Sequence, residues 1–165
     1  MKNQKGFSLI ELLIVVVIIG IIAAIAIPNL LAARRSANEG SAISACRTLH
    51  GAQMTYASTY GNGDYAGNTS FDGQALSDLA TPGLVDTVLG SGTKSSYVFV
   101  GIRVARSPSA PAQFGFSTIP STPTGITATG SRRFGIQTDG VLKADSTNTA
   151  QYADLTALSN AAPLQ

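Results

Sequence analysis

Between Lys5 and Pro28 the sequence reads KGFSLIELLIVVVIIGIIAAIAIP, and one charged side chain, Glu11, interrupts the apolar run from Phe7 to Ile27. If this run forms a helix, it is about 31 Å long, which is enough to cross the hydrocarbon layer of a membrane. A carboxylate inside such a segment costs roughly 2.5 to 3.5 kcal/mol on insertion scales. We therefore expect Glu11 to have a partner or a task.

Two ordinary uses of an apolar amino-terminal run compete with a more specialised one. A basic start and the A-x-A pattern Ala24-Ile25-Ala26 are compatible with a secretory signal that is removed after Ala26. The same run is long enough for a simple membrane anchor. The apolar core is longer than the roughly 7 to 15 residues of a secretory signal, and an anchor would not need Glu11.

The string Lys5-Gly6-Phe7-Ser8-Leu9-Ile10-Glu11, with the apolar run and Pro28 behind it, resembles the prepilin motif of type IV pilins and secretion pseudopilins. The resemblance implies that a membrane peptidase cuts between Gly6 and Phe7 and removes residues 1–6 as a leader. It also implies that the new amino terminus, Phe7, is N-methylated. Residues 7–30 would then form a transmembrane and assembly helix, and residues 31–165 a globular pilin domain.

The same resemblance implies a structural subunit of a bacterial type IV pilus rather than an enzyme. Its partners would be further copies of the chain, the prepilin peptidase and methyltransferase, the inner-membrane assembly machinery, and membrane lipid before assembly. The chain would begin as a single-pass inner-membrane precursor and end in an extracellular pilus or a periplasmic pseudopilus. A pseudopilin of a type II secretion system is one alternative. A membrane-anchored or secreted binding module with an ordinary export signal is another.

Within this interpretation, Glu11 of an incoming subunit is expected to pair with the amino terminus of its neighbour, Phe7. Cleavage would create the cation, because the free or methylated amine is protonated at neutral pH. Phe7 and Glu11 are also i, i+4 neighbours, so an intrachain pair or the positive end of the helix competes as an explanation of Glu11.

Two further residues of the apolar run bear on its flexibility. Pro28 removes a backbone donor and predicts a bend, and Gly20 weakens the helix eight residues earlier. The family resemblance implies that the stretch from Gly20 to Pro28 can extend inside a fibre. A static kink is the competing reading.

The charges of the chain give no support for nucleic-acid binding. The sequence has 11 Lys and Arg against 9 Asp and Glu, and loss of Lys2 and Lys5 with the leader would leave 9 against 9. A mature chain without net side-chain charge has little self-repulsion, which suits a subunit that must assemble.

Beyond the apolar run, helical periodicity continues to about Tyr60, and the other face of this stretch carries Glu39, Arg47 and Thr48. A helix from Phe7 to Tyr60 would be about 80 Å long, so we expect its first half to protrude and its second half to pack. The mostly apolar stripe consists of Ile43, Cys46, Leu49, Gln53, Tyr56, Ala57 and Tyr60.

The rest of the chain predicts a small antiparallel sheet that covers this stripe, an α+β fold of the type IV pilin kind. Asn62-Gly63-Asp64 ends the long helix, and a short helix over Gln74–Ala80 stops at Pro82-Gly83. Strands are expected over residues 96–105 and 113–119, and a hairpin over 132–143 that turns at Asp139-Gly140.

Candidates for catalysis or metal binding are few, and we predict no catalytic residue, no cofactor and no metal. Cys46 and His50 are four residues apart, but no third group orients them, and a buried structural pair is favoured. Asp139, Asp145 and Asp154 have no EF-hand spacing and are read as turn residues. With one cysteine the chain cannot close the carboxy-terminal disulfide of many pilins, so another contact must hold its end.

Overall fold

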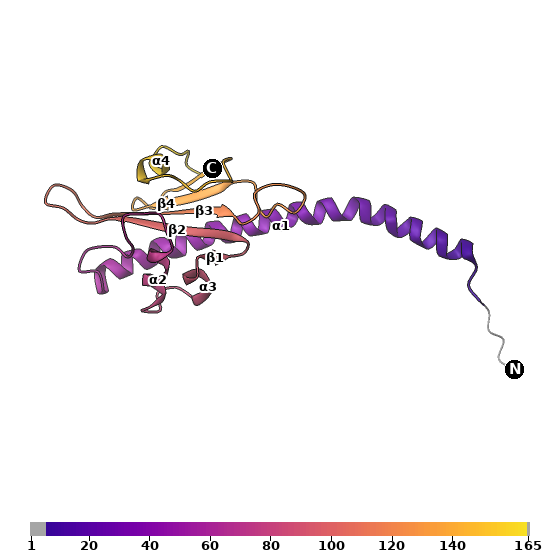
Figure 1. The fold of residues 1–165 in the computed structure, drawn as a ribbon, viewed down its shortest axis with the longest axis horizontal. Coiled ribbons are helices and arrows are strands. Elements are labelled where there is room, and N and C mark those ends of the chain that lie inside the picture. Colours follow the sequence, from indigo (N-terminus) through magenta and orange to yellow (C-terminus); the bar gives the residue numbers. More distant parts are fainter. Residues whose placement is uncertain (1–5, 165) are drawn as a thin grey trace. The chain divides into compact units, whose positions relative to one another are not determined.

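The computed structural model describes residues 6–164. Helix α1 (Leu9–Thr59) comes first, followed by α2, α3, strands β1 to β5 and helix α4 (Figure 1). The chain divides into two compact units, one up to Arg34 and one from Arg35 onward. Of the predicted leader, residues 1–5 lie outside the described residues, and with them Lys2 and Lys5.

The first part of α1, as far as Arg34, is the predicted apolar helix. An apolar segment satisfies its own backbone N–H and C=O groups most simply as a helix. None of the described residues from Gly6 to Arg34 is buried, and the large apolar side chains from Phe7 to Leu30 are between 51% and 84% exposed. Nothing within this unit covers the apolar surface.

Helix α1 continues through both Gly20 and Pro28. Next to the proline, the side-chain amide of Asn29 donates to the Ile25 carbonyl at 3.0 Å. The flexibility of this stretch, and any bend at Pro28, remain predictions.

The second part of α1, from Arg35 to Thr59, carries the packed face. The predicted stripe is confirmed at its centre, where Cys46, Leu49 and Gln53 are buried, whereas Tyr60 follows the helix and is 55% exposed. The alanines Ala42, Ala45 and Ala52 share this buried face and let the helix approach the sheet closely.

The prediction that Glu39 lies on the exposed face is wrong. Its side chain is 7% exposed, and its carboxylate accepts hydrogen bonds from Ser131 and forms an ion pair with Arg132 at 2.9 Å. Burial alone raises the pKa of Glu39, but the Ser131 N–H and hydroxyl and the Arg132 guanidinium outweigh it and hold the pKa below 4.5.

The sheet is antiparallel, with its strands in sequence order. The predicted hairpin is confirmed, with Gly140 at φ +73° in the turn between β4 and β5. The strands are β1 (Thr93–Lys94), β2 (Tyr97–Val104), β3 (Gln113–Pro120), β4 (Arg133–Gln137) and β5 (Leu142–Asp145).

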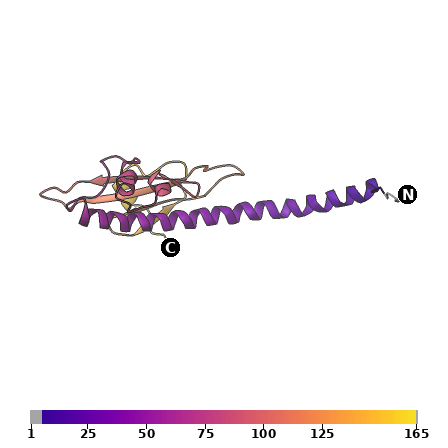
Figure 2. The same cartoon turned by 90° about the horizontal axis from the view of Figure 1, so that it is seen from below.

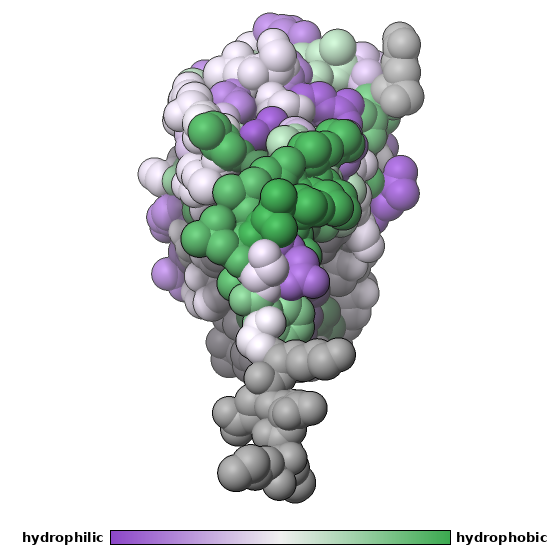
Figure 3. All heavy atoms as spheres, turned by 90° about the vertical axis from the view of Figure 1, so that its right-hand side faces the viewer, coloured by the Kyte–Doolittle hydropathy of each residue, from purple (hydrophilic) through white to green (hydrophobic). Residues whose placement is uncertain are grey.

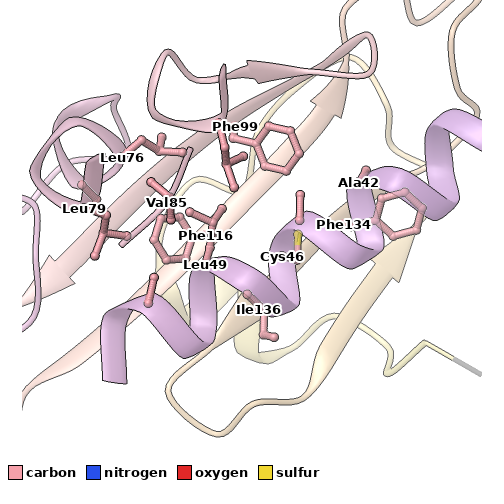
Figure 4. Close-up of a cluster of buried hydrophobic side chains, with 14 of the residues drawn as sticks. Ala42, Cys46, Leu49, Leu76, Leu79, Val85, Phe99, Phe116, Phe134 and Ile136 are labelled. Atoms are coloured by element: carbon pink, nitrogen blue, oxygen red, sulfur yellow. The ribbon is translucent and has the colours of Figure 1, made fainter. Parts of the chain in front are cut away.

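One face of the sheet packs against α1, and Figure 2 shows helix and sheet as two layers. Figure 4 shows Cys46 and Leu49 of α1 directed toward sheet residues such as Phe134 and Ile136. Helix α2 (Gln74–Ala80), which has the predicted bounds, adds Leu76 to the same core. Fully burying one such side chain contributes about 1.5 to 3 kcal/mol.

The carboxy-terminal segment packs on the other face of the sheet, and its contacts there hold this end of the chain in place. Tyr152 is 2% exposed, and its N–H donates to the Ser117 hydroxyl at 3.0 Å. The Arg133 guanidinium lies 3.9 Å from the centre of the Tyr152 ring and pairs with Asp145 at 2.9 Å. A buried aromatic ring under a paired cation thus holds the carboxy-terminal segment of a chain that has a single cysteine.

Glycines make room for helix α4 (Leu155–Ser159) on this face. A Cβ on Gly135 would lie 2.4 Å from Leu158, and one on Gly115 would lie 2.5 Å from Leu155. The glycines are therefore needed for close approach of helix and sheet.

Both long edges of the sheet are covered. Beyond β5, the Leu164 N–H donates to the Leu142 carbonyl at 2.8 Å, and the Ala144 N–H to Ala162 at 3.0 Å. Along β2, Gly101 exchanges two backbone hydrogen bonds with Asp72 of the preceding loop. The outermost strand, β1, has two residues.

Three short elements were not expected from the sequence: α3 (Thr87–Gly90), β1 and α4. Asp86 and Asp154 cap the two helices by accepting hydrogen bonds from Leu89 and Ala157. Elements this short carry no periodic pattern, and the capping aspartates were their one local signal.

Candidate functional site

The amino-terminal part of the chain presents a continuous apolar surface. Apolar side chains gather along the part of the molecule that faces the viewer in Figure 3. By length and composition, α1 is long and apolar enough to cross a membrane. Because its apolar residues lie on all sides, lipid or other helices can cover it, whereas a single flat surface cannot. Its exposed members include Leu9, Leu13, Val16, Ile19, Ile22, Ile25 and Leu30.

Glu11 lies at the third position of α1 and accepts a hydrogen bond from the Ser8 N–H at 2.7 Å. Ser8 precedes the first helical residue, so the pair forms one half of a capping box. The pattern Ser-x-x-Glu is the sequence signal for this cap, whereas the predicted local partners of Glu11 were the amino terminus of Phe7 and the positive end of the helix. Within the described residues, the second carboxylate oxygen of Glu11 has no hydrogen bond.

The predicted cleavage site lies directly before the helix. Gly6 and Phe7 are exposed and outside any regular element, so a peptidase can reach the bond between them. A Cβ on Gly6 would meet nothing within 4 Å, so the fold of the chain does not require glycine here. A requirement for Gly6 would have to come from an enzyme that binds this stretch. Cleavage and methylation at these residues remain predictions.

In the uncleaved chain, Phe7 and Glu11 are not an ion pair, because the Phe7 nitrogen is part of a peptide bond. The structure brings Ser8 and Glu11 together, while the proposed partner of Glu11 exists only after cleavage. Capping uses one carboxylate oxygen and leaves the other to a second donor.

Cys46 and His50 form no catalytic pair. Cys46 is fully buried, and burial raises the pKa of its thiol to about 12. His50 Nε2 lies 3.4 Å from the Thr138 carbonyl oxygen, and its ring packs against Phe114. The preference for a buried structural thiol is confirmed.

The three carboxylates considered for calcium have separate structural roles. Asp139 caps the β4–β5 turn by accepting from the Val141 N–H, Asp145 pairs with Arg133, and Asp154 caps α4. In residues 6–164, no group of three or more His, Cys, Asp or Glu side chains is placed to hold a metal ion.

Residues 1–27 match the family model of the prokaryotic N-terminal methylation motif. The chain carries this motif, and behind it lies a long amino-terminal helix with a five-stranded antiparallel sheet, which is the α+β pilin-like fold. The predicted resemblance and fold class are confirmed.

Its curated relatives are type IV pilins and type II secretion pseudopilins. The chain is 69% identical to the type IV wide pilus major component PilA4 of Thermus thermophilus over 39 residues, 24% of this chain and 30% of that protein. It is 44% identical to the type IV major pilin protein PilA of Myxococcus xanthus over 54 residues, 33% of this chain and 24% of that protein. Core protein G of the Klebsiella pneumoniae type II secretion system is 36% identical over 56 residues, 34% and 40% of the two chains.

These matches span less than half the length of each relative. No solved structure matches the chain. The likeness therefore concerns the motif and the amino-terminal helix, and the folded unit is known from its own structure.

Proposed function

We propose that the chain is the structural subunit of a bacterial type IV pilus, without enzymatic activity of its own. It is made as an inner-membrane precursor, cleaved between Gly6 and Phe7, methylated on Phe7, and assembled through its apolar helix. The observation that supports the proposal most strongly is the uncovered apolar surface between Phe7 and Leu30, with one carboxylate at its amino-terminal end. Such a surface is stable only in lipid or against like surfaces.

The mechanism uses the free oxygen of Glu11. Hydrolysis of the bond between Gly6 and Phe7 leaves a protonated amine on Phe7, and methylation keeps its charge. Glu11 continues to cap Ser8 with one oxygen and accepts the amine of a neighbouring copy with the other. In an apolar surrounding, an unpaired carboxylate is costly, so the pair favours one axial register between neighbouring helices. The apolar helices then bundle, and the folded units surround them.

A pilus subunit is favoured over a pseudopilin by the degree of identity. The chain is 69% identical to PilA4 over 39 residues and 79% identical to a fimbrial protein of Pseudomonas aeruginosa over 29 residues. Over matches of similar length, it is 44% identical to PilA of Myxococcus xanthus over 54 residues and 36% identical to core protein G of Klebsiella over 56 residues. The match to core protein G covers more of the chain, 34% against 24%, and keeps a subunit of a secretion pseudopilus as the second candidate.

Mass spectrometry of chains isolated from the membrane tests the processing step. We expect the mature chain to begin at Phe7 and to carry the mass of one added methyl group. In a Gly6→Val variant we expect full-length precursor to accumulate, with the folded unit unchanged, because a Cβ at position 6 would meet no other described residue within 4 Å. Chains that begin at Ile27 would instead establish a secretory signal and overturn the proposal.

Electron microscopy of material sheared from the cell surface separates the two candidates. Long surface fibres that contain this chain support the pilus subunit. Assemblies confined to the periplasm, together with a loss of protein secretion when the chain is deleted, would favour the pseudopilin.

A further inference from the structure

The loop between β3 and β4, residues 121–132, lies along α1 and is fixed to it by polar contacts. The Arg35 guanidinium donates to the Ala128 carbonyl at 2.9 Å and to the Ile126 carbonyl at 3.0 Å. One turn further, the Asn38 amide donates to the Thr129 carbonyl at 2.9 Å. Glu39, next along the helix, binds Ser131.

The loop is also closed on itself. The Thr129 N–H donates to the Thr122 carbonyl at 2.8 Å, and the Thr122 N–H to the Thr129 hydroxyl at 3.2 Å. Asn148 donates to the Pro123 carbonyl at 2.8 Å. A loop fixed in this way loses little conformational freedom when it binds a partner.

At the centre of this fixed loop, Ile126 is 79% exposed. It is the most exposed large apolar side chain among the described residues of the folded unit, ahead of Val88 and Tyr60 at 55% each. A single exposed isoleucine is ordinary on a protein surface. Here, however, three hydrogen bonds from Arg35 to Gly125, Ile126 and Ala128 hold an apolar side chain outward at a defined place.

The proposed pairing of Glu11 with Phe7 determines which part of a neighbouring helix lies beside this loop. If Glu11 of one copy meets Phe7 of the next and the helices are parallel, the two helices are displaced by four residues, about 6 Å. The turn of α1 that holds the loop, at Arg35, is then level with residue 31 of the neighbour. The exposed apolar side chain nearest that level is Leu30, which is 69% exposed.

We infer that Ile126 and the loop around it dock on the apolar helix of a second copy of this chain, beside Leu30. In the fibre, this contact would lie where the folded units meet the helical bundle. It rests on the proposed assembly. Burying an isoleucine at this contact is expected to strengthen the association of two copies roughly tenfold or more.

Cysteine cross-linking in assembled fibres tests the contact. The native Cys46 is fully buried, so we expect it to form no cross-link. Cells would produce two full-length variants together, Ile126→Cys and Leu30→Cys, and sheared fibres would be oxidised. We expect a covalent dimer that contains one chain of each kind. Two matched controls should give none: Ile126→Cys with Val17→Cys, far along the same apolar helix, and Leu30→Cys with Val104→Cys, an exposed residue at 45%.

A second variant, Ile126→Ser, measures the energetic effect. Because the side chain is exposed, the melting temperature of the monomer in detergent should not change, whereas fibres should dissociate at a lower detergent concentration than wild-type fibres. Fibres that form normally, show no mixed dimer and dissociate as the wild type does would overturn the contact and leave the proposed function standing. Failure of the unsubstituted chain to form any fibre or pseudopilus would overturn both.

Discussion

Residues 7–34 and residues 35–164 differ in how their apolar side chains are covered. In the first region no described residue is buried, and the one carboxylate is Glu11, which caps its own helix. In the second region the helix, the sheet and the carboxy-terminal segment bury their apolar residues on one another. The first region depends on other molecules for cover, while the second is complete within one chain.

Under the proposed assembly, this difference would also explain why the relatives match over only a short part of the chain. Where a surface must fit copies of itself and the assembly machinery, few substitutions are tolerated at most of its positions. A core that packs within one chain tolerates other apolar residues of similar volume. The 69% identity over 39 residues in a protein of which the match covers 30% fits this division. Substitutions in the two regions should therefore have separable effects.

The largest effect is expected at Glu11. Glu11→Leu should leave membrane insertion and melting of the folded unit unchanged but reduce fibres more than a hundredfold, since removal of one member of a buried ion pair costs about 3 to 5 kcal/mol. The measurement is the amount of sheared fibre relative to total chain in the membrane.

Glu11→Gln separates capping from charge, because the amide oxygen can still accept the Ser8 N–H. If the charge pairs with a neighbour, this variant loses fibres as Glu11→Leu does. Wild-type amounts of fibre from Glu11→Gln would reduce the role of Glu11 to that of a helix cap.

In the folded unit, the largest effect is expected from Tyr152→Ala. Loss of this buried ring should lower the free energy of unfolding by about 3 to 5 kcal/mol, measured by urea unfolding of the full-length chain in detergent. Tyr152→Phe keeps the ring under Arg133 and should cost less than about 1.5 kcal/mol. Equal losses in both variants would show that the ring does not hold the carboxy-terminal segment.

A smaller loss is expected from Glu39→Gln, about 1 to 3 kcal/mol near neutral pH, because the partner Arg132 is partly exposed and regains water. The pKa of Glu39 is lowered in the folded chain, so its contribution is complete above its usual pKa of 4.5 and is lost as pH falls through the lower folded value. The stability difference between wild type and variant should therefore shrink in acid, and a constant difference from pH 7 to pH 3 would contradict this role.

The smallest effect is expected at Cys46. Its buried thiol, with a pKa of about 12, should react with a thiol reagent at pH 8 only after unfolding. Fibres of a Cys46→Ala variant should be as abundant as those of the wild type. Rapid labelling of the folded chain would contradict the burial of Cys46, and loss of fibres in this variant would indicate that Cys46 has a role in assembly, such as a disulfide between chains.

The apolar helix, the bounds of α2 and the β4–β5 hairpin were predictable because local signals determine them: an unbroken apolar run, a Pro-Gly stop and an Asp-Gly turn. The place of Glu39 was not, because Ser131 and Arg132 lie 92 and 93 residues away in the chain. The contacts of Tyr152 also depend on distant residues, Ser117 of β3 and Arg133 of β4. The cap formed by Ser8 and Glu11 was also predictable, because Ser-x-x-Glu before an apolar run is a local sequence signal.

The covered edges of the sheet limit how copies of this chain could associate in the proposed assembly. A sheet grows by adding strands to free backbone donors and acceptors, and here Ala162 and Leu164 occupy those of β5, while Asp72 occupies those of Gly101 on β2. In the proposed assembly a further copy would therefore find no long free edge on a folded neighbour, and ordered growth would depend on the helices. Peeling the last few residues from β5 would open a template for strand stacking, so the carboxy-terminal tail also acts as a guard against amyloid-like association.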